Sequence, residues 1–253
     1  MIPIRDTIPT RNPPIATYIL ILINVLIFLF ELTMPPAMLE RFFYVFGVVS
    51  ARFTNPEWAA FLGFPADTYW PFLTRMFVHA GWFHIIGNMW TLWIFGDNVE
   101  DRMGPVRFVI FYLLCGLAAS IVHWLTNPTS TVPAVGASGA IAGVMGAYLV
   151  LFPYAQIILL VPIGFFPFFF ALPAVTYLAF WALTQVLSGT LALSLAGPYE
   201  VGGVAWWAHA GGFVAGIALQ VLFVRRGGEY RRPVRDEYFV DGAWMPSGYW
   251  REH

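Results

Sequence analysis

The stretch AVGASGAIAGVMGAYLVLFP, residues 134–153, predicts a helix buried among other helices. Almost all of it is apolar or small, and Gly139, Gly143 and Ala147 recur at every fourth position, which places them on one face of a helix. Small residues at this spacing let two helix backbones approach closely in lipid. Ser138 stands at the start of this helix, where a serine can be a helix cap, a packing residue or a nucleophile.

The 253-residue chain has the composition of a membrane protein. Its residues are 59% hydrophobic, 18% aromatic and only 11% charged, whereas an ordinary soluble domain has roughly 25% charged residues. The formal net charge of −1, without a basic stripe, argues against nucleic acid as a partner. The single cysteine, Cys115, lies in an apolar run and offers neither a disulfide framework nor a thiol metal site. We expect no cofactor and no metal ion.

Six apolar runs approach the length that a helix needs to cross a hydrocarbon core, about 20 residues for about 30 Å. They are residues 16–34, 82–96, 106–126, 138–153, 174–196 and 205–224. A further apolar block, 155–173, contains Pro162 and Pro167, which disfavour a helix, so we interpret it as an interfacial segment. Whether 155–172 inserts in the membrane stays open. The predicted fold class is all-α: a polytopic membrane protein built as a six-transmembrane-helix bundle.

The chain divides into three regions around these runs. A cytoplasmic N-terminus, 1–15, precedes a six-helix membrane domain, 16–226, and a flexible cytoplasmic tail, 227–253, follows it. Within the membrane domain, the first connection, 35–81, mixes charges with many aromatic residues and is expected to lie on the membrane surface.

Arginine alone sets the expected orientation, because the chain has no lysine. With both termini in the cytoplasm, the outer segments hold Arg41, Arg52 and Arg75, and the cytoplasmic segments hold all the other arginines. A seventh span would put the arginine-rich tail outside and invert this asymmetry. We therefore predict a multi-pass integral protein of the cell membrane with cytoplasmic N- and C-termini.

Three polar residues are predicted to lie at one depth in the membrane. At 1.5 Å per helical residue, Ser138, His209 and His84 lie roughly 22, 24 and 20 Å from the cytoplasmic ends of their helices. Polar groups buried in a membrane are costly and commonly mark function. Asn88 follows His84 by four residues and so shares its helix face.

A second ridge of small residues, Gly212 and Gly216, lies on the helix of His209. Two such ridges let the helices of Ser138 and His209 come together, so that hydroxyl and imidazole reach hydrogen-bond distance. That is the first requirement for a nucleophile activated by a general base. The sequence thus predicts acyl transfer, with His84, Asn88 and the Ser138 backbone N–H as oxyanion donors.

Four motifs together resemble the rhomboid intramembrane serine proteases, over nearly the whole chain. GASG (136–139) is similar to the Gly-x-Ser-Gly nucleophile motif of that family, and HIIGN (84–88) to its His-x-x-x-Asn motif. HAGGFVAG (209–216) is similar to its last-helix histidine with Gly-x-x-x-Gly, and FGDNVEDRMG (95–104) to its second-helix exit.

The resemblance implies a serine endopeptidase that cleaves single-pass membrane proteins in or beside their transmembrane helix, with membrane lipid as the other partner. It implies that Ser138 is the nucleophile and His209 the base, and that His84, Asn88 and the Ser138 amide form the oxyanion site. The residues expected to support the site structurally are Gly136, Gly139, Gly143, Gly212, Gly216, His79, Glu100 and Arg102. Two positions depart from the family: Trp70–Pro71 where many members have Trp-Arg, and Ala142 where some have a tyrosine under the histidine.

Other interpretations accompany these. His79 is expected to fix the first loop through a hydrogen bond, and His84 and Asn88 have interhelical hydrogen bonding as their alternative role. Glu31 and Gln185 are interpreted as interfacial or packing residues. His123 is interpreted as interfacial and His253 as part of the tail. The alternative function is a catalytically inactive rhomboid-like protein that binds client transmembrane helices; a transporter would show paired repeats or midplane charges, which this sequence lacks.

Overall fold

The computed structural model describes residues 2–65, 68–164, 166–195 and 205–225, and two short strands, β4 (Phe239–Val240) and β5 (Ala243–Trp244). The rest of the predicted tail, 227–253, including His253, lies outside the described residues.

Among the described residues, six long helices coincide with the six predicted apolar runs. They are α1 (Ile15–Glu31), α6 (Trp82–Met103), α7 (Pro105–Thr126), α8 (Ser138–Leu151), α9 (Ala174–Leu195) and α10 (Trp206–Phe223). Within the described residues, three helical stretches are by themselves long and apolar enough to cross a membrane: Pro105–Thr126, Ala174–Ala192 and Trp206–Phe223. Helices α1 and α8 are apolar but shorter.

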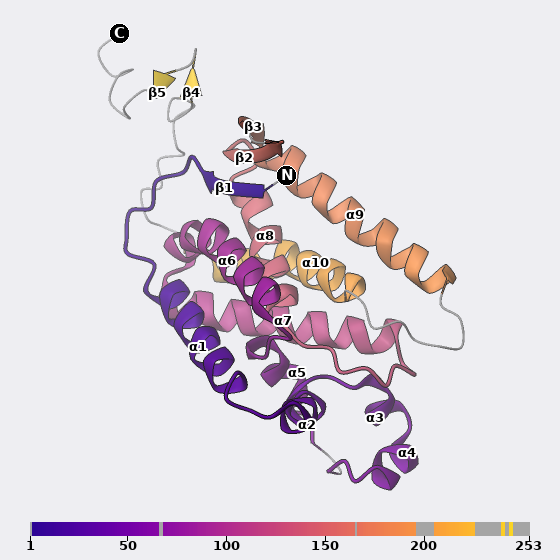
Figure 1. Cartoon of the computed structure of the whole chain (residues 1–253). Helices are drawn as coiled ribbons and strands as arrows, with labels where there is room; N and C mark the ends of the chain where they lie inside the picture. Colours follow the sequence, from indigo (N-terminus) through magenta and orange to yellow (C-terminus); the bar gives the residue numbers. More distant parts are fainter. Residues whose placement is uncertain are drawn as a thin grey trace.

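Helix α8 is the centre of the bundle (Figure 1). Every residue from Gly139 to Tyr148 is buried, and α8 packs against α6, α7, α9 and α10. Its closest neighbour is α10, because a Cβ atom at Gly212 or Gly216 would overlap the backbone carbonyl of Gly139 or Gly143. The absence of side chains at these positions lets the two backbones touch.

Glu100 near the end of α6 holds the start of α1. Its carboxylate accepts the backbone N–H groups of Ala16 and Thr17 at 2.8 and 2.7 Å, and the Thr17 hydroxyl at 2.8 Å. The first N–H groups of a helix have no partner within the helix, so this buried carboxylate serves as the N-terminal cap of α1. Nearby, the guanidinium of Arg102 lies over the ring of Phe152, 5.8 Å from its centroid.

A three-stranded antiparallel sheet joins the N-terminus to the α8–α9 connection. The strands β1 (Ile2–Asp6), β2 (Gln156–Ile163) and β3 (Phe166–Pro173) lie in the order β1-β2-β3. Alternate residues of β2, Ile157 and Leu159, are buried in the core. Strand β1 therefore attaches the start of the predicted cytoplasmic N-terminus, 1–15, to this connection.

The expectation of an all-α fold is wrong at this sheet, although most of the chain is helical. The interfacial segment predicted at 155–173 forms a β-hairpin whose turn contains Gly164, with a φ of +60° that favours glycine. Pro162 pairs with Pro167 beyond the part of β2 that contacts β1. At this point β2 has a neighbouring strand on one side only, where a proline without an N–H is tolerated. Prolines that exclude a helix are thus compatible with this hairpin.

The first connection, 35–81, forms short helices at the end of the bundle opposite to the sheet (Figure 1). They are α2 (Pro36–Phe46), α3 (Ser50–Thr54), α4 (Pro56–Phe61), α5 (Pro71–Thr74) and the 3-10 helix η1 (Arg75–Phe77). The connection between α7 and α8 packs against them through a bridge between Val48 and Ala134 and a hydrogen bond from the Ala51 N–H to the Ser130 carbonyl at 2.9 Å.

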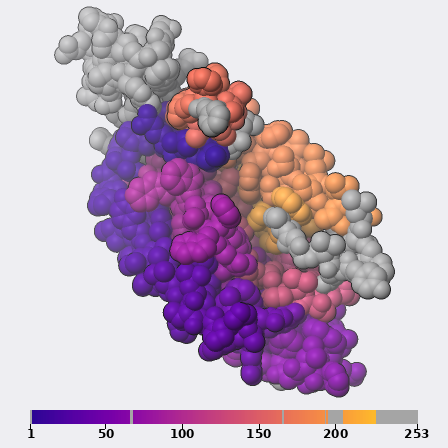
Figure 2. Space-filling view, viewed as in Figure 1, coloured from indigo at the N-terminus to yellow at the C-terminus, as the bar shows by residue number. Residues whose placement is uncertain are grey.

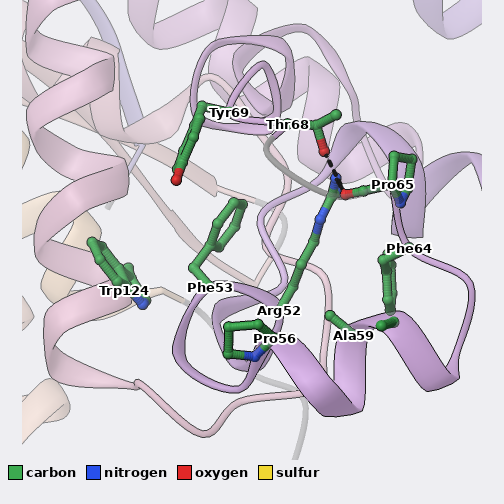
Figure 3. A pocket seen from close by; sticks show the side chains of 10 residues that line it. Arg52, Phe53, Pro56, Ala59, Phe64, Pro65, Thr68, Tyr69 and Trp124 are labelled. Atoms are coloured by element: carbon green, nitrogen blue, oxygen red, sulfur yellow. Dashed lines mark hydrogen bonds between the residues drawn. The ribbon is translucent and has the colours of Figure 1, made fainter.

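Arg52 is an anchor inside this connection (Figure 3). The side chain is buried, and its Nη2 donates to the Pro65 carbonyl at 3.1 Å. Its guanidinium lies 5.5 Å from the ring centroid of Phe53 and 5.3 Å from that of Phe64, within cation–π range. These residues border a cavity of about 180 Å³. This chain has Trp70–Pro71 where a Trp-Arg pair is common, and Arg52 supplies an arginine that holds the connection.

Candidate active site

The loop before α8 depends on glycine at position 136. Gly136 has a φ of +113°, and a Cβ atom there would lie 2.5 Å from Nε2 of His84. Its N–H donates to the carbonyl of Arg75 at 2.8 Å. The loop is therefore pinned between η1 and α6 just before the chain enters α8.

Ser138 is the first residue of α8 and contacts the histidine of α10. The helix cap is Ala137, which is itself helical and makes no side-chain capping bond. The Ser138 Oγ instead lies 2.7 Å from Nε2 of His209. The interpretation of Ser138 as only a helix cap is therefore wrong.

His209 is held from its other side by α9. Its Nδ1 lies 2.8 Å from Oε1 of Gln185, and the ring of Trp181 lies beside the imidazole with centroids 6.0 Å apart and planes inclined by 33°. The aromatic neighbour of His209 is thus Trp181 of α9. Position 142 of α8, where a tyrosine is the alternative, holds an alanine.

Gln185 is the site residue that sequence reasoning missed. The sequence predicts an interfacial or packing residue, whereas in the structure Gln185 is only 5% exposed and its amide contacts the imidazole of His209. The available signal was a lone amide in an apolar span, where an unsatisfied polar group is costly. The spacing of Gln185 to Trp181 by four residues, which puts both on one helix face, also pointed to a shared contact.

His84 and Asn88 of α6 both reach the loop that contains Gly136 and precedes Ser138, called the serine loop below. The Cβ position of Gly136 is 2.5 Å from the His84 ring and 3.6 Å from Nδ2 of Asn88. Asn88 is 7% exposed, and among the described residues its Nδ2 has no hydrogen-bond partner. A buried donor without a partner costs about 1–3 kcal/mol, and such a donor is ready to bind a charge that develops during a reaction.

His79 and Glu31 join the first connection to the end of α1. The His79 backbone N–H donates to both carboxylate oxygens of Glu31, at 3.2 and 3.4 Å, and both residues are buried. The His79 ring lies edge-on to that of His84, with centroids 5.1 Å apart. Burial, with repulsion from His84 adding to it, lowers the pKa of His79 to about 3, so that its ring is neutral at physiological pH.

The arrangement supplies a hydroxyl, a base, and donors beside the hydroxyl, which are the parts needed for acyl transfer. It brings together Ser138, His209, His84 and Asn88 from α6, α8 and α10, and adds Gln185 from α9. Within the part of the chain that the structure describes, no three His, Cys, Asp or Glu side chains are grouped as a metal ion would require.

The comparisons with known proteins agree with the motifs. A family model described as Rhomboid domain matches residues 66–226. Rhomboid protein 1 of Saccharomyces cerevisiae, a mitochondrial protein, is 32% identical over 173 residues, which are 67% of this chain and 45% of the yeast protein. Rhomboid-like protein 11 of Arabidopsis thaliana, a chloroplastic protein, is 38% identical over 104 residues, 41% of this chain and 34% of that protein.

Rhomboid protease GluP of Bacillus subtilis is 40% identical over 81 residues, which are 32% of this chain and 15% of GluP. The chain thus spans less than half the length of each of these three relatives. The family model covers the serine loop, the first-connection end, and all five helices from α6 to α10. The chain is a membrane protein that belongs to the rhomboid family.

Proposed function

We propose that this chain is an intramembrane serine endopeptidase that cleaves peptide bonds in or next to transmembrane helices. The observation that carries the proposal is the 2.7 Å contact between Ser138 Oγ and His209 Nε2. Both residues lie within the matched rhomboid domain, and the name of GluP describes that relative as a rhomboid protease.

The reaction proceeds by acyl transfer. His209 Nε2 accepts the Ser138 proton as Oγ attacks the scissile carbonyl, and the resulting imidazolium protonates the leaving amine as the C–N bond breaks. Water then attacks the acyl-enzyme, with His209 again accepting the proton, and Ser138 is regenerated.

The tetrahedral oxyanion is stabilised by donors around the serine loop. The Ser138 N–H lies at the N-terminus of α8, where the helix dipole favours negative charge. The Nδ2 of Asn88 supplies a second donor, and the ring of His84 lies against the same loop. Each donor of this kind contributes about 3–4 kcal/mol to transition-state stabilisation in characterised enzymes.

The proposed setting is the cell membrane, with six spans and both termini in the cytoplasm. The arginine distribution supports this orientation, and the placement of the sheet and the first connection at opposite ends of the bundle agrees with it. Exposed aromatic residues of β3, Phe166, Phe168 and Phe169, suit contact with lipid.

The proposed substrates are single-pass transmembrane proteins. They reach the site from the side, between α6 and α9, where atoms of α10 are visible in the space-filling view (Figure 2). Cleavage within or beside the substrate helix then requires local unwinding at the serine, because a helix buries its own carbonyl groups in hydrogen bonds.

The test is labelling of the detergent-solubilised protein with a fluorophosphonate probe, mapped by mass spectrometry. Label on Ser138 that is lost in Ser138→Ala and in His209→Ala is the expected result. Matched controls are Ser120→Ala and His123→Ala, which remove a buried serine and a buried histidine of α7 and should keep the label. An unlabelled but folded wild-type protein would favour the alternative, a catalytically inactive protein that binds client helices.

A further inference from the structure

The amide orientation of Gln185 is determined by its own helix. Its Nε2 donates to the Trp181 carbonyl at 3.2 Å and to the Thr184 hydroxyl oxygen at 3.1 Å. Both amide hydrogens therefore have acceptors in α9, which leaves Oε1 to face Nδ1 of His209 at 2.8 Å. A carbonyl oxygen only accepts hydrogen bonds, so the proton of the neutral imidazole lies on Nδ1.

We propose that Gln185 is a positioning residue that holds His209 in the tautomer that can activate Ser138. With the proton on Nδ1, the lone pair of Nε2 points to the Ser138 hydroxyl, 2.7 Å away. The opposite tautomer would place an N–H there and could accept no proton. The inference rests on the proposed serine protease function and adds a third residue to the pair.

A neutral acceptor suits this position in the membrane. Gln185 is 5% exposed on α9, a helix apolar enough to span a bilayer, where an ionised carboxylate would be costly. The amide nevertheless polarises the N–H of His209 and stabilises the imidazolium as it forms. Trp181, one turn away, packs on the same ring, so α9 sets both the tautomer and the orientation of the base.

The experiment compares Gln185→Leu with Gln185→Glu, using Gln220→Leu as the matched control. Leu keeps the approximate size and removes the acceptor, whereas Glu retains an acceptor oxygen. Gln220 lies on α10, eleven residues beyond His209 and half-buried. The readouts are kcat, KM and the pH dependence of cleavage of a transmembrane substrate in detergent, together with the 15N chemical shifts of the His209 ring.

The expected result is a roughly tenfold lower kcat in Gln185→Leu with little change in KM, since the bond orients the base and does not bind substrate. The 15N shifts should report mixed tautomers in this variant. Gln185→Glu should recover most of kcat and move the acid limb of the pH profile to higher pH by about one unit, because the imidazolium and the carboxylate would stabilise each other's charge, which offsets the cost of burying that carboxylate. Gln220→Leu should match the wild type.

Two results would overturn the inference. Wild-type kcat and wild-type ring shifts in Gln185→Leu would show that the contact does not affect His209. Equal losses of kcat in the Leu and Glu variants would show that Gln185 has only a packing role. Failure of the proposed function is a separate outcome, because it would appear as an inactive, unlabelled wild-type protein.

Discussion

Gly136 shows how one residue controls the serine loop. Its φ of +113° is a conformation that other residues rarely adopt, and the space that a side chain would need is taken by His84. Ser138 follows two residues later, so any shift of this loop changes the distance from Oγ to His209. A misplacement of about 1 Å can reduce catalysis by about a hundredfold.

Gly136→Ala is therefore expected to slow fluorophosphonate labelling of Ser138 by about a hundredfold. Strain of about 1–3 kcal/mol should also lower the thermal midpoint by several degrees. The control is Gly87→Ala in α6, where a Cβ atom would meet no other heavy atom within 4 Å. Equal labelling rates in the two variants would contradict the assigned role of Gly136.

The long helices depend on contacts at their ends as well as on their apolar surfaces. Glu100 of α6 caps α1, and Glu31 at the end of α1 binds the backbone of His79. Helix α1 is thus held at both ends by carboxylates, one near the proposed cytoplasmic side and one near the first connection. In a chain that spans a bilayer, burying a carboxyl group costs free energy unless it is hydrogen-bonded.

Replacing Glu100 with Gln should destabilise the protein without removing the active serine. The amide would turn one acceptor oxygen into a donor that faces backbone N–H groups, at a cost of about 1–3 kcal/mol. We expect a lower thermal midpoint in detergent, with normal labelling of Ser138 at low temperature. Asp101→Asn is the control, since Asp101 accepts from Asn12 in an exposed setting and should change the midpoint much less.

At the sheet end of the molecule, Asp6 of β1 links the sheet to the helix bundle. The Asp6 carboxylate accepts from the Tyr148 hydroxyl of α8 and from Nδ2 of Asn98 in α6 at 2.8 Å. One residue near the N-terminus thus connects the sheet to two helices far along the chain. Burial raises the pKa of Asp6 to about 7, and repulsion from Asp97 adds to the effect, whereas the bond from Tyr148 opposes it.

The contribution of Asp6 to the stability of the folded protein should decrease as the pH rises. Asp6 keeps its proton in the folded protein up to about pH 7, whereas in the unfolded chain it ionises near pH 4. Its contribution to stability is therefore complete below about pH 4 and is lost as the pH rises through about 7.

Thermal unfolding in detergent between pH 4 and pH 8 measures this effect. We expect the wild-type midpoint to fall by about 5 °C relative to that of Asp6→Asn, which keeps an acceptor oxygen but does not ionise. The difference between the two proteins isolates Asp6 from the other groups that titrate in this range. Parallel curves for the two proteins would show that Asp6 does not contribute.

The six long helices, the approach of α8 to α10 and the family all follow from the amino-acid sequence alone. The length of an apolar run and the recurrence of glycine at every fourth residue are local properties of the sequence. They can be recognised without knowing which segments contact each other. Motif spacing identified Ser138, His209, His84 and Asn88 as one candidate set, and the structure places these four residues together.

Contacts between segments that share no sequence pattern are seen only once the helices and strands have packed together. Gln185 reaches His209 from another helix, β1 pairs with β2 from more than 150 residues away, and Arg52 finds its acceptor in a loop. Each pairing depends on where separate elements pack and on which buried polar groups then need partners. These pairings cannot be predicted from a periodic pattern in the sequence, because the free energy of a buried hydrogen bond depends on the surroundings that packing creates.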